Sequence, residues 1–216
     1  MTANTKADPA KAYDWRLRGR AWVLGHEITH QGGVVPGWIV TGRHMDPAEI
    51  IPHLFEETDP GFHTRCRPGD IIVAGRSFGM GPKMNGYIAM QALGLGLVCE
   101  SMPFLGYRGA IGAGLRVLTD CQGATEECET GDELEVDFDR GMFINHTRGT
   151  RREYPPLADS LKEIIALGGN TGWLRQWWGR QQGDGAGDGA QLLAGSPSNS
   201  APHSASHARL AAESKS

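Results

Sequence analysis

Apolar residues occur along this chain in short runs that polar or glycine-rich segments separate. Runs of adjacent aliphatic residues between turns are typical of strands buried on both faces, whereas apolar–charged alternation is typical of a half-exposed strand. Residues 70–75 and 95–100 show the first pattern, and residues 133–138 show the second. The pattern predicts strands at residues 19–25, 70–75, 95–100, 116–118 and 133–138.

Helical patterns fill the segments between these strands. The clearest start is at Asp46, which can cap a helix, because Pro47 fits its first turn and Glu49 can complete a capping box. This helix would carry on one face Ile50, Ile51, Leu54 and Phe55. Further helices are predicted near residues 84–94, 103–114, 157–167 and 171–178. Strands that alternate with helices indicate an α/β domain.

The two ends of the chain differ from its middle in composition. Residues 1–17 are polar, and residues 181–216 consist largely of glycine, alanine and serine with little apolar surface to bury. We therefore expect a flexible N-terminus at residues 1–17 and one folded domain at residues 18–180. The remaining residues 181–216 are expected to be a disordered low-complexity tail.

The composition narrows the class of function. With 39% hydrophobic and 21% charged residues, the chain has the profile of a soluble globular protein. A net charge of -4 without any large basic block argues against nucleic acid or an anionic membrane as the main partner. No apolar run approaches the roughly 20 residues of a membrane helix, and the N-terminus lacks the apolar core of a signal peptide. We therefore expect a cytoplasmic protein.

The cysteines Cys66, Cys99, Cys121 and Cys128 are isolated from one another. A disulfide framework is not expected in a cytosolic chain of this size, and zinc or iron–sulfur sites normally show close cysteine pairs. We therefore expect no metal or cofactor on this chain. Any iron–sulfur cluster would belong to a partner.

Residues 75–83, which we call the glycine loop, follow a predicted buried strand and precede a predicted helix. Free backbone N–H groups and the helix dipole favour an anion at such a place. Gly79 and Gly81 allow a ligand to approach the backbone closely, and Lys83 adds a positive charge. The alternative is a tight connection that needs glycines only for its turn. The spacing fits neither a P-loop nor a dinucleotide-binding fingerprint.

The segment from His26 to His30 matches the H-E-x-x-H pattern of zinc proteases, in which both histidines lie on one face of a helix. Here the segment follows a strand pattern and runs directly into Gln31 and two glycines, where a helix would stop. A polar loop near a ligand is therefore favoured over a zinc site.

Two further features allow either a functional or a structural interpretation. Arg108 follows a buried strand and can orient an acidic substrate, although such an arginine often pairs with a structural carboxylate instead. Three tryptophans, Trp173, Trp177 and Trp178, either mark a partner surface or pack on their own domain.

The order and spacing of these segments resemble the small subunit of 3-isopropylmalate dehydratase, which is also the swivelling C-terminal domain of aconitases. The resemblance covers residues 18–178. It runs to the C-terminal helix through the segments GRAWVLG, VVPG, DPAEIIPHLFEETDPGF, RPGDIIVAGRSFGMG, ALGLGLVCES, YRGAIGAGLRVL and GDELEVDFDRG.

The resemblance implies a swivelling β/β/α domain of three layers that works with a large subunit carrying a [4Fe–4S] cluster. The implied hydro-lyase reaction removes water from a hydroxy di- or tricarboxylic acid and often adds it back in the isomeric position. The iron then acts as a Lewis acid on the departing hydroxide, and a base removes the proton beside a carboxylate. Closure of the small domain excludes water and fixes the geometry.

The glycine loop departs from the family pattern. The family usually has Asn-Phe-Gly-Cys-Gly-Ser-Ser-Arg-Glu-His, and this chain has Ser-Phe-Gly-Met-Gly-Pro-Lys-Met-Asn-Gly at residues 77–86. The serine that is the proposed base in the relatives and the arginine that grips a carboxylate are therefore absent. The loop residues expected to line the substrate site are Gly79, Met80, Gly81, Pro82 and Met84.

The loop after the first predicted strand departs as well. The family's Asp-Asn-Ile-Asp-Thr-Asp is replaced at residues 26–31, and Phe104 occupies the position of a common family arginine. Both altered loops should face one cleft, in which we expect His26, Thr29 and Arg108 to contact the substrate.

Two hypotheses of function remain at this point. In the first, the chain is an active small subunit, and Lys83, His30 or His26 takes the proton; Lys83 could instead pair with a carboxylate. In the second, the chain is a non-catalytic binding or regulatory module that keeps the swivel fold. Removing the chain from an active complex and measuring turnover separates the two.

Overall fold

A computed structural model describes residues 8–81 and 85–184 of the 216-residue chain. The described part forms a seven-stranded sheet in the order β4-β3-β2-β1-β5-β6-β7. Strands β1 to β4 are parallel, whereas β5 to β7 form an antiparallel meander that joins the sheet at β1. The strands are β1 (Arg16–Val23), β2 (Ile71–Ala74), β3 (Gly96–Cys99), β4 (Arg116–Leu118), β5 (Glu133–Asp137), β6 (Met142–Asn145) and β7 (Thr150–Glu153).

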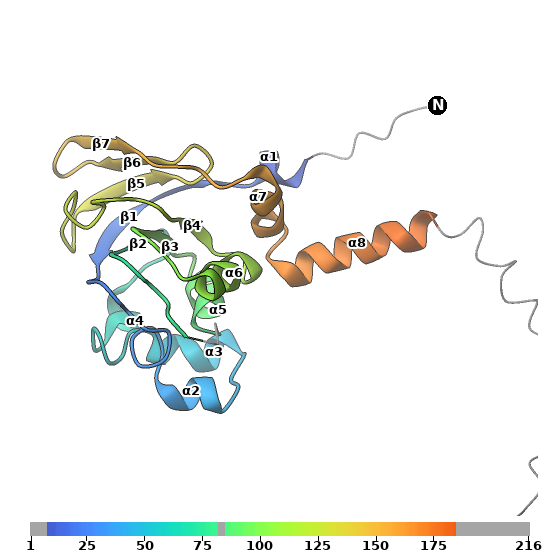
Figure 1. Ribbon diagram of the computed structural model, residues 1–216, viewed down its shortest axis with the longest axis horizontal. Coiled ribbons are helices and arrows are strands. Elements are labelled where there is room, and N and C mark those ends of the chain that lie inside the picture. Colours follow the sequence, from blue (N-terminus) through green and yellow to red (C-terminus); the bar gives the residue numbers. More distant parts are fainter. Residues whose placement is uncertain (1–7, 82–84, 185–216) are drawn as a thin grey trace, which may run out of the picture. The chain divides into compact units, whose positions relative to one another are not determined.

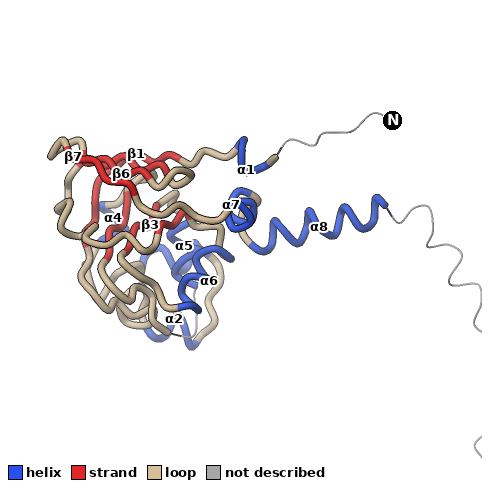
Figure 2. The backbone as a smooth tube through the Cα atoms, turned by 45° about the horizontal axis from the view of Figure 1, so that its top comes forward, coloured by secondary structure: helices blue, strands red, loops and turns tan. Residues whose placement is uncertain are grey.

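The helices gather mainly on one side of the parallel strands. They are α1 (Pro9–Ala12), α2 (Gly37–Thr41), α3 (Pro47–Ile50), the 3-10 turn η1 (Ile51–His53), α4 (Phe62–Arg65), α5 (Asn85–Ala92), α6 (Phe104–Gly112), α7 (Asp159–Ala166) and α8 (Asn170–Asp184). Figure 1 shows the antiparallel strands as one layer, the parallel strands as the next and helices α2 to α6 beyond them. The turned view in Figure 2 separates the same three layers. The expected β/β/α fold is confirmed.

The helix start predicted at Asp46 is confirmed. The Asp46 carboxylate accepts the backbone N–H of Ala48 at 2.9 Å, and Pro47 begins α3. The helix is shorter than predicted, because Pro52 has no N–H to donate and Phe55 adopts a left-handed φ of 56°. The apolar side chains of Ile50, Leu54 and Phe55 are nevertheless buried, as the pattern indicated.

Described elements lie on both sides of the expected domain boundaries at residues 18 and 180. Strand β1 starts at Arg16, because Trp15 is buried and Arg16 already pairs with Asp137 of β5. Helix α8 continues to Asp184. The chain divides into two units, Met1–Trp177 and Trp178–Ser216. The rest of the expected tail, residues 185–216, lies outside the described residues, as do residues 1–7.

Strands β6 and β7 complete the antiparallel layer and were not among the predicted strands. The residues of β7 read Thr-Arg-Arg-Glu, and three of these four side chains are exposed. A polar edge strand has no apolar alternation, because neither face is covered, and its charges discourage further strand pairing. Its position is set instead by register with β6, in which Asn145 pairs with Thr150.

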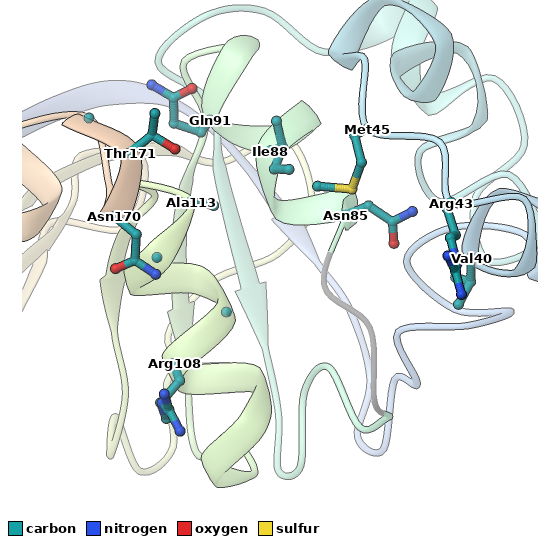
Figure 3. A pocket seen from close by; sticks show the side chains of 13 residues that line it. Val40, Arg43, Met45, Asn85, Ile88, Gln91, Arg108, Ala113, Asn170 and Thr171 are labelled. Carbon is teal, nitrogen blue, oxygen red and sulfur yellow. The ribbon is translucent and has the colours of Figure 1, made fainter. Parts of the chain in front are cut away.

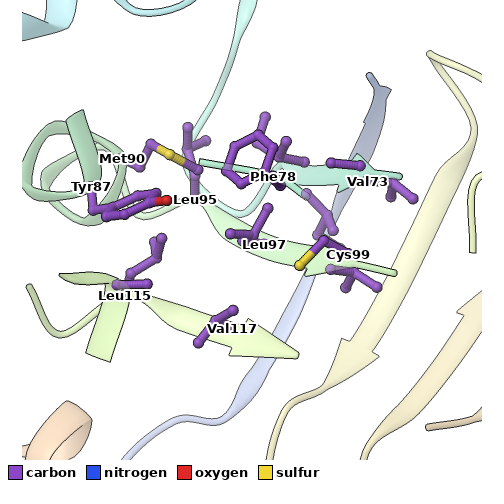
Figure 4. Packing of buried hydrophobic residues seen from close by; sticks show 14 of the residues in the cluster. Val73, Phe78, Tyr87, Met90, Leu95, Leu97, Cys99, Leu115 and Val117 are labelled. Carbon is purple, nitrogen blue, oxygen red and sulfur yellow. The ribbon is translucent and has the colours of Figure 1, made fainter. Parts of the chain in front are cut away.

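The hydrophobic core lies between the parallel strands and the helices, and the glycine loop is anchored in it. Strands β2 and β3 are buried along their whole length. Figure 4 shows Phe78, from the glycine loop, packed with Tyr87 and Met90 of α5 above Leu97 of β3. Each such side chain contributes roughly 1.5–3 kcal/mol on burial. The start of the glycine loop is therefore fixed by the core.

All four cysteines are free thiols. Burial raises the pKa of Cys99 and of Cys128 to about 12. Within residues 8–81 and 85–184, no three His, Cys, Asp or Glu side chains are grouped so that they could hold a metal ion. None of the helices in that part has the length and apolar character needed to cross a membrane.

Candidate functional site

The two loops that depart from the family pattern lie side by side at the carboxyl edge of the parallel strands. Thr29 and Met80 form a parallel β-bridge, and the His30 N–H donates to the Met80 carbonyl at 2.7 Å. The Gly79 N–H donates to the Ile28 carbonyl, also at 2.7 Å. The sequence expectation that both loops face one place agrees with this pairing.

Steric crowding explains part of the glycine content of the loop. Gly79 has a φ of 78°, and a Cβ added there would lie 1.8 Å from the Tyr87 hydroxyl. Gly106 of α6 packs onto the Gly79 carbonyl, where an added Cβ would lie at 2.9 Å. Gly81 has a φ of 131° and is exposed. Close packing therefore accounts for Gly79, and the anion site expected at this loop stays a prediction.

The remaining loop residues are placed as follows. Met80 is half-buried, while the Thr29 hydroxyl donates to the Gln31 carbonyl at 2.7 Å in a local turn. Pro82, Lys83 and Met84 lie outside the described residues. The roles expected for these three residues therefore stay predictions.

His30 is buried, and its ring is already engaged. Its Nε2 accepts the backbone N–H of Gly86 at 3.1 Å, which satisfies one of the free donors of the first turn of α5. Burial lowers the pKa of His30 to about 4, against a smaller opposing effect of the Asn85 side chain. The ring is therefore neutral near pH 7, with its proton on Nδ1. Because the lone pair of Nε2 is occupied, the structure gives His30 a structural contact, and its expected role as a catalytic base stays a prediction.

His26 is exposed, and its Nδ1 accepts the backbone N–H of Arg76 at 3.0 Å. The two histidines of the H-E-x-x-H segment thus contact opposite flanks of the glycine loop. Residues 26–31 form no helix. The zinc alternative therefore has no support, because its chemistry needs both rings on one helical face.

A pocket of about 750 Å³ lies along helices α5 and α6 (Figure 3). It begins at Asn85, directly after the glycine loop, and contains the predicted Arg108. Its lining residues are Val40, Arg43, Met45, Asn85, Ile88, Gln91, Arg108, Gly109, Gly112, Ala113, Gly168, Asn170 and Thr171. Among the described residues that line it there are two arginines and no carboxylate, which gives this lining a positive charge.

Arg43 and Arg108 supply this charge from different elements. Arg108 is exposed, and its guanidinium lies 5.4 Å from the centre of the Phe104 ring. Arg43 is exposed as well and adopts a left-handed φ of 57°, which is uncommon for a residue with a side chain. In Figure 3 the two side chains lie on different sides of the pocket, whose apolar lining includes Met45 and Ile88.

Sequence reasoning did not find Arg43. The residue reaches the pocket because Asn85 holds the turn after α2 against α5: its Nδ2 donates to the carbonyls of Ile39 at 3.2 Å and His44 at 2.8 Å. These bonds join residues more than forty positions apart. The adjacent Gly42 is an ordinary turn signal, and no spacing rule indicates such a contact.

The comparisons with known proteins bear on this geometry. No family model matches the chain. The 3-isopropylmalate dehydratase small subunit 1 of Archaeoglobus fulgidus is 39% identical over 158 residues, which cover 70% of this chain and 92% of that protein. The chain belongs to the family of 3-isopropylmalate dehydratase small subunits. A second member, small subunit 1 of Methanopyrus kandleri, is 38% identical over 156 residues, 71% of this chain and 89% of that protein.

Two proteins of Methanocaldococcus jannaschii extend the comparison within this family. An isopropylmalate/citramalate isomerase small subunit is 31% identical over 163 residues, 74% of this chain and 94% of that protein. The crystal structure of a 3-isopropylmalate dehydratase superposes with a TM-score of 0.70 at 27% identity, covering 79% of this chain and 99% of that one. The predicted family and swivel-domain fold are thus confirmed, and the chain is a component of a dehydratase or isomerase.

Proposed function

We propose that this chain is the small subunit of a two-chain hydro-lyase acting on a hydroxy di- or tricarboxylic acid similar to 3-isopropylmalate. In this proposal the domain closes over a substrate that an iron–sulfur large subunit holds. The observation that carries it is the pocket between Arg43 and Arg108, whose described lining holds no carboxylate, in a chain of this family. A site rich in arginine and free of acids suits an anion.

The pocket residues suit different parts of such a substrate. Arginine presents several N–H donors in a planar fork, so Arg43 and Arg108 would each orient a carboxylate. Apolar groups of Met45 and Ile88 would contact an aliphatic branch. The pocket would thus favour a branched hydroxy acid over a small one, because burial of each added CH₂ contributes about 0.8 kcal/mol.

The [4Fe–4S] cluster in this proposal belongs to the large subunit. The thiols of this chain do not fit such a group, because Cys99, Cys121 and Cys128 are buried and their raised pKa values keep them protonated. When bound by the partner, the cluster would supply a Lewis acid for the departing hydroxide. This chain would contribute carboxylate binding, exclusion of water and the position of the glycine loop.

The proton transfer is assigned to Lys83 rather than to either histidine. His30 is not a candidate in the described conformation, because its Nε2 accepts the Gly86 N–H. Lys83→Ala should then abolish turnover. An unchanged kcat in this variant would exclude Lys83 as the base.

The absence of the family's Ser-Ser-Arg motivates a second candidate function, a non-catalytic binding or regulatory module.

The test is anaerobic reconstitution of this chain with the large subunit from the same source, followed by dehydration assays on a series of hydroxy acids. Arg43→Ala and Arg108→Ala should each lower kcat/KM by roughly 10- to 100-fold, since a hydrogen bond to a charged group contributes about 1.5–3 kcal/mol. Arg140→Ala is the matched control, because Arg140 is exposed and lies outside this pocket. Full turnover by the large subunit alone would instead support the non-catalytic module.

A further inference from the structure

The two histidines of the H-E-x-x-H segment need a role other than zinc binding. They do not lie on one helix, and the Nε2 lone pair of His30 is already engaged. Each imidazole accepts one backbone N–H, but through different ring nitrogens. His26 uses Nδ1 for the Arg76 N–H at 3.0 Å, and His30 uses Nε2 for the Gly86 N–H at 3.1 Å. Arg76 is the second residue of the glycine loop, and Gly86 lies in the first turn of α5, three residues beyond the loop. We refer to these two positions as the flanks of the loop.

Both contacts also depend on glycines at those flanks. A Cβ added at Gly75 would lie 2.1 Å from His26 Nδ1, so any other residue would displace that ring. A Cβ added at Gly86 would lie 3.2 Å from His30 Cε1 and 2.7 Å from Val34 Cγ1. Each imidazole thus approaches, with the edge that carries its acceptor nitrogen, a backbone that has no side chain at the point of contact.

Backbone hydrogen bonds reinforce the same two places. The Glu27 N–H donates to the Arg76 carbonyl at 2.7 Å, directly beside the His26 contact. The His30 N–H donates to the Met80 carbonyl at 2.7 Å, so His30 holds the chain before residues 82–84 with its backbone and after them with its side chain. The five residues from His26 to His30 therefore contact the chain on both sides of the loop.

We propose that His26 and His30 are a pair of positioning residues, whose unprotonated ring nitrogens hold the two flanks of the glycine loop in place for the reaction. The anchoring itself follows from the contacts above, while its catalytic consequence rests on the proposed function. Both rings must be neutral, because an imidazolium has no lone pair to accept an N–H. Neither ring touches the reacting atoms in this proposal.

The use of opposite ring nitrogens gives a sharp set of variants. The Asn Oδ1 is two bonds from Cβ, as is His Nδ1, whereas the Gln Oε1 is three bonds from Cβ, as is His Nε2. His26→Asn and His30→Gln therefore keep an acceptor at the required place. His26→Gln and His30→Asn carry the same amide group, but its oxygen lies at the wrong distance from Cβ. We call His26→Asn and His30→Gln the matched variants, and His26→Gln and His30→Asn the mismatched variants, which serve as controls.

The first measurement is amide hydrogen exchange of Arg76 and Gly86 in the full chain by NMR. We expect His26→Gln to speed exchange at Arg76 by about tenfold without affecting Gly86, and His30→Asn to do the converse. The variants His26→Asn and His30→Gln should exchange within about twofold of the wild-type chain. Equal exchange in the matched and mismatched variants of both histidines would overturn the proposal, including the anchoring.

The second measurement is turnover of the reconstituted complex. The mismatched variants should lower kcat by about tenfold with little change in KM, and the matched variants should restore it, since a displaced loop affects the transition state more than binding. Equal kcat in all four variants would overturn the catalytic part. If the wild-type complex has no hydro-lyase activity, the proposed function fails, and the exchange experiment still decides the anchoring.

Discussion

The arginines around the antiparallel strands and the two arginines of the pocket differ in their partners. In the antiparallel half, arginines pair with carboxylates across strands and turns: Arg16 with Asp137, Arg18 with Glu133, Arg148 with Asp132 and Glu129, and Arg152 with Glu127. In the pocket over the parallel half, Arg43 and Arg108 have no ion pair among the described residues. Ion pairs in the antiparallel half join strands and turns of the fold, whereas Arg43 and Arg108 keep their guanidinium groups available to a ligand.

The two halves also differ in how closely they are packed around glycines with similar backbone angles. Gly79 in the glycine loop has a φ of 78° and no room for a Cβ, whereas Gly149 between β6 and β7 has a φ of 69° and no atom within 4 Å of that position. Gly79→Ala should lower the free energy of unfolding by roughly 3 kcal/mol through strain and overpacking. Gly149→Ala should cost about 1 kcal/mol, from the backbone alone.

Urea titration of both glycine variants measures this difference. If both variants lose the same free energy of unfolding, the strained backbone angle alone accounts for the loss. The glycine loop would then not be tightly packed around Gly79.

Acid should weaken the two halves over different ranges of pH. His30 has a pKa of about 4 when folded and 6.5 when unfolded, so the unfolded chain binds its proton first as the pH falls. Its contribution is complete above pH 6.5 and declines toward pH 4, by up to roughly 3 kcal/mol. The Asp132 pKa is lowered from 3.8, mainly by the Glu129 N–H that it accepts, so its contribution is complete above pH 3.8 and declines only below it.

Denaturant unfolding at a series of pH values separates the two contributions. In the His30→Gln variant, the free energy of unfolding should depend less on pH between pH 6.5 and 4. The loss of stability below pH 3.8 should remain. An unchanged slope in this variant would mean that His30 is not the buried neutral group described.

The ion pairs of the antiparallel half should each contribute little. Arg148→Ala removes contacts to Asp132 at 3.0 Å and to Glu129 at 2.8 Å. The Glu129 side chain is 83% exposed, and Asp132 keeps its hydrogen bonds from the Glu129 N–H and the Asn145 side chain. We expect a loss of less than about 1 kcal/mol that shrinks further in high salt. A larger, salt-independent loss in thermal unfolding would contradict the assignment of these pairs to the surface.

The smallest effect on stability is expected in the pocket. Arg43→Ala and Arg108→Ala should change the free energy of unfolding by no more than about 0.5 kcal/mol, because neither side chain is buried. Together with the loss of kcat/KM, this result would separate binding from folding. A strongly destabilised Arg108→Ala would instead indicate that its contact with Phe104 serves the structure.

Features set by neighbouring residues could be predicted from the sequence, and those set by distant contacts could not. The Asp46 cap and the buried strand at residues 71–74 follow from local chemistry and apolar runs. Strand β7 was not predicted, because its residues are polar. The place of Arg43 in the pocket was not predicted, because Asn85 holds the turn that carries it through hydrogen bonds to residues far away in the sequence. The structural contact of His30 could not be predicted for the same reason, since its burial and its Gly86 partner exist only in the folded chain.

The burial of the cysteines has a practical consequence for handling the protein in air. Oxidation proceeds through the thiolate, and at pH 7 a thiol whose pKa is about 12 is ionised in only about one molecule in 10⁵. Even the half-buried Cys66 has a raised pKa, because burial disfavours its charged form. The thiols of this chain should therefore stay reduced in air. We expect storage in aerated buffer to leave all four thiols reactive toward a thiol reagent after unfolding.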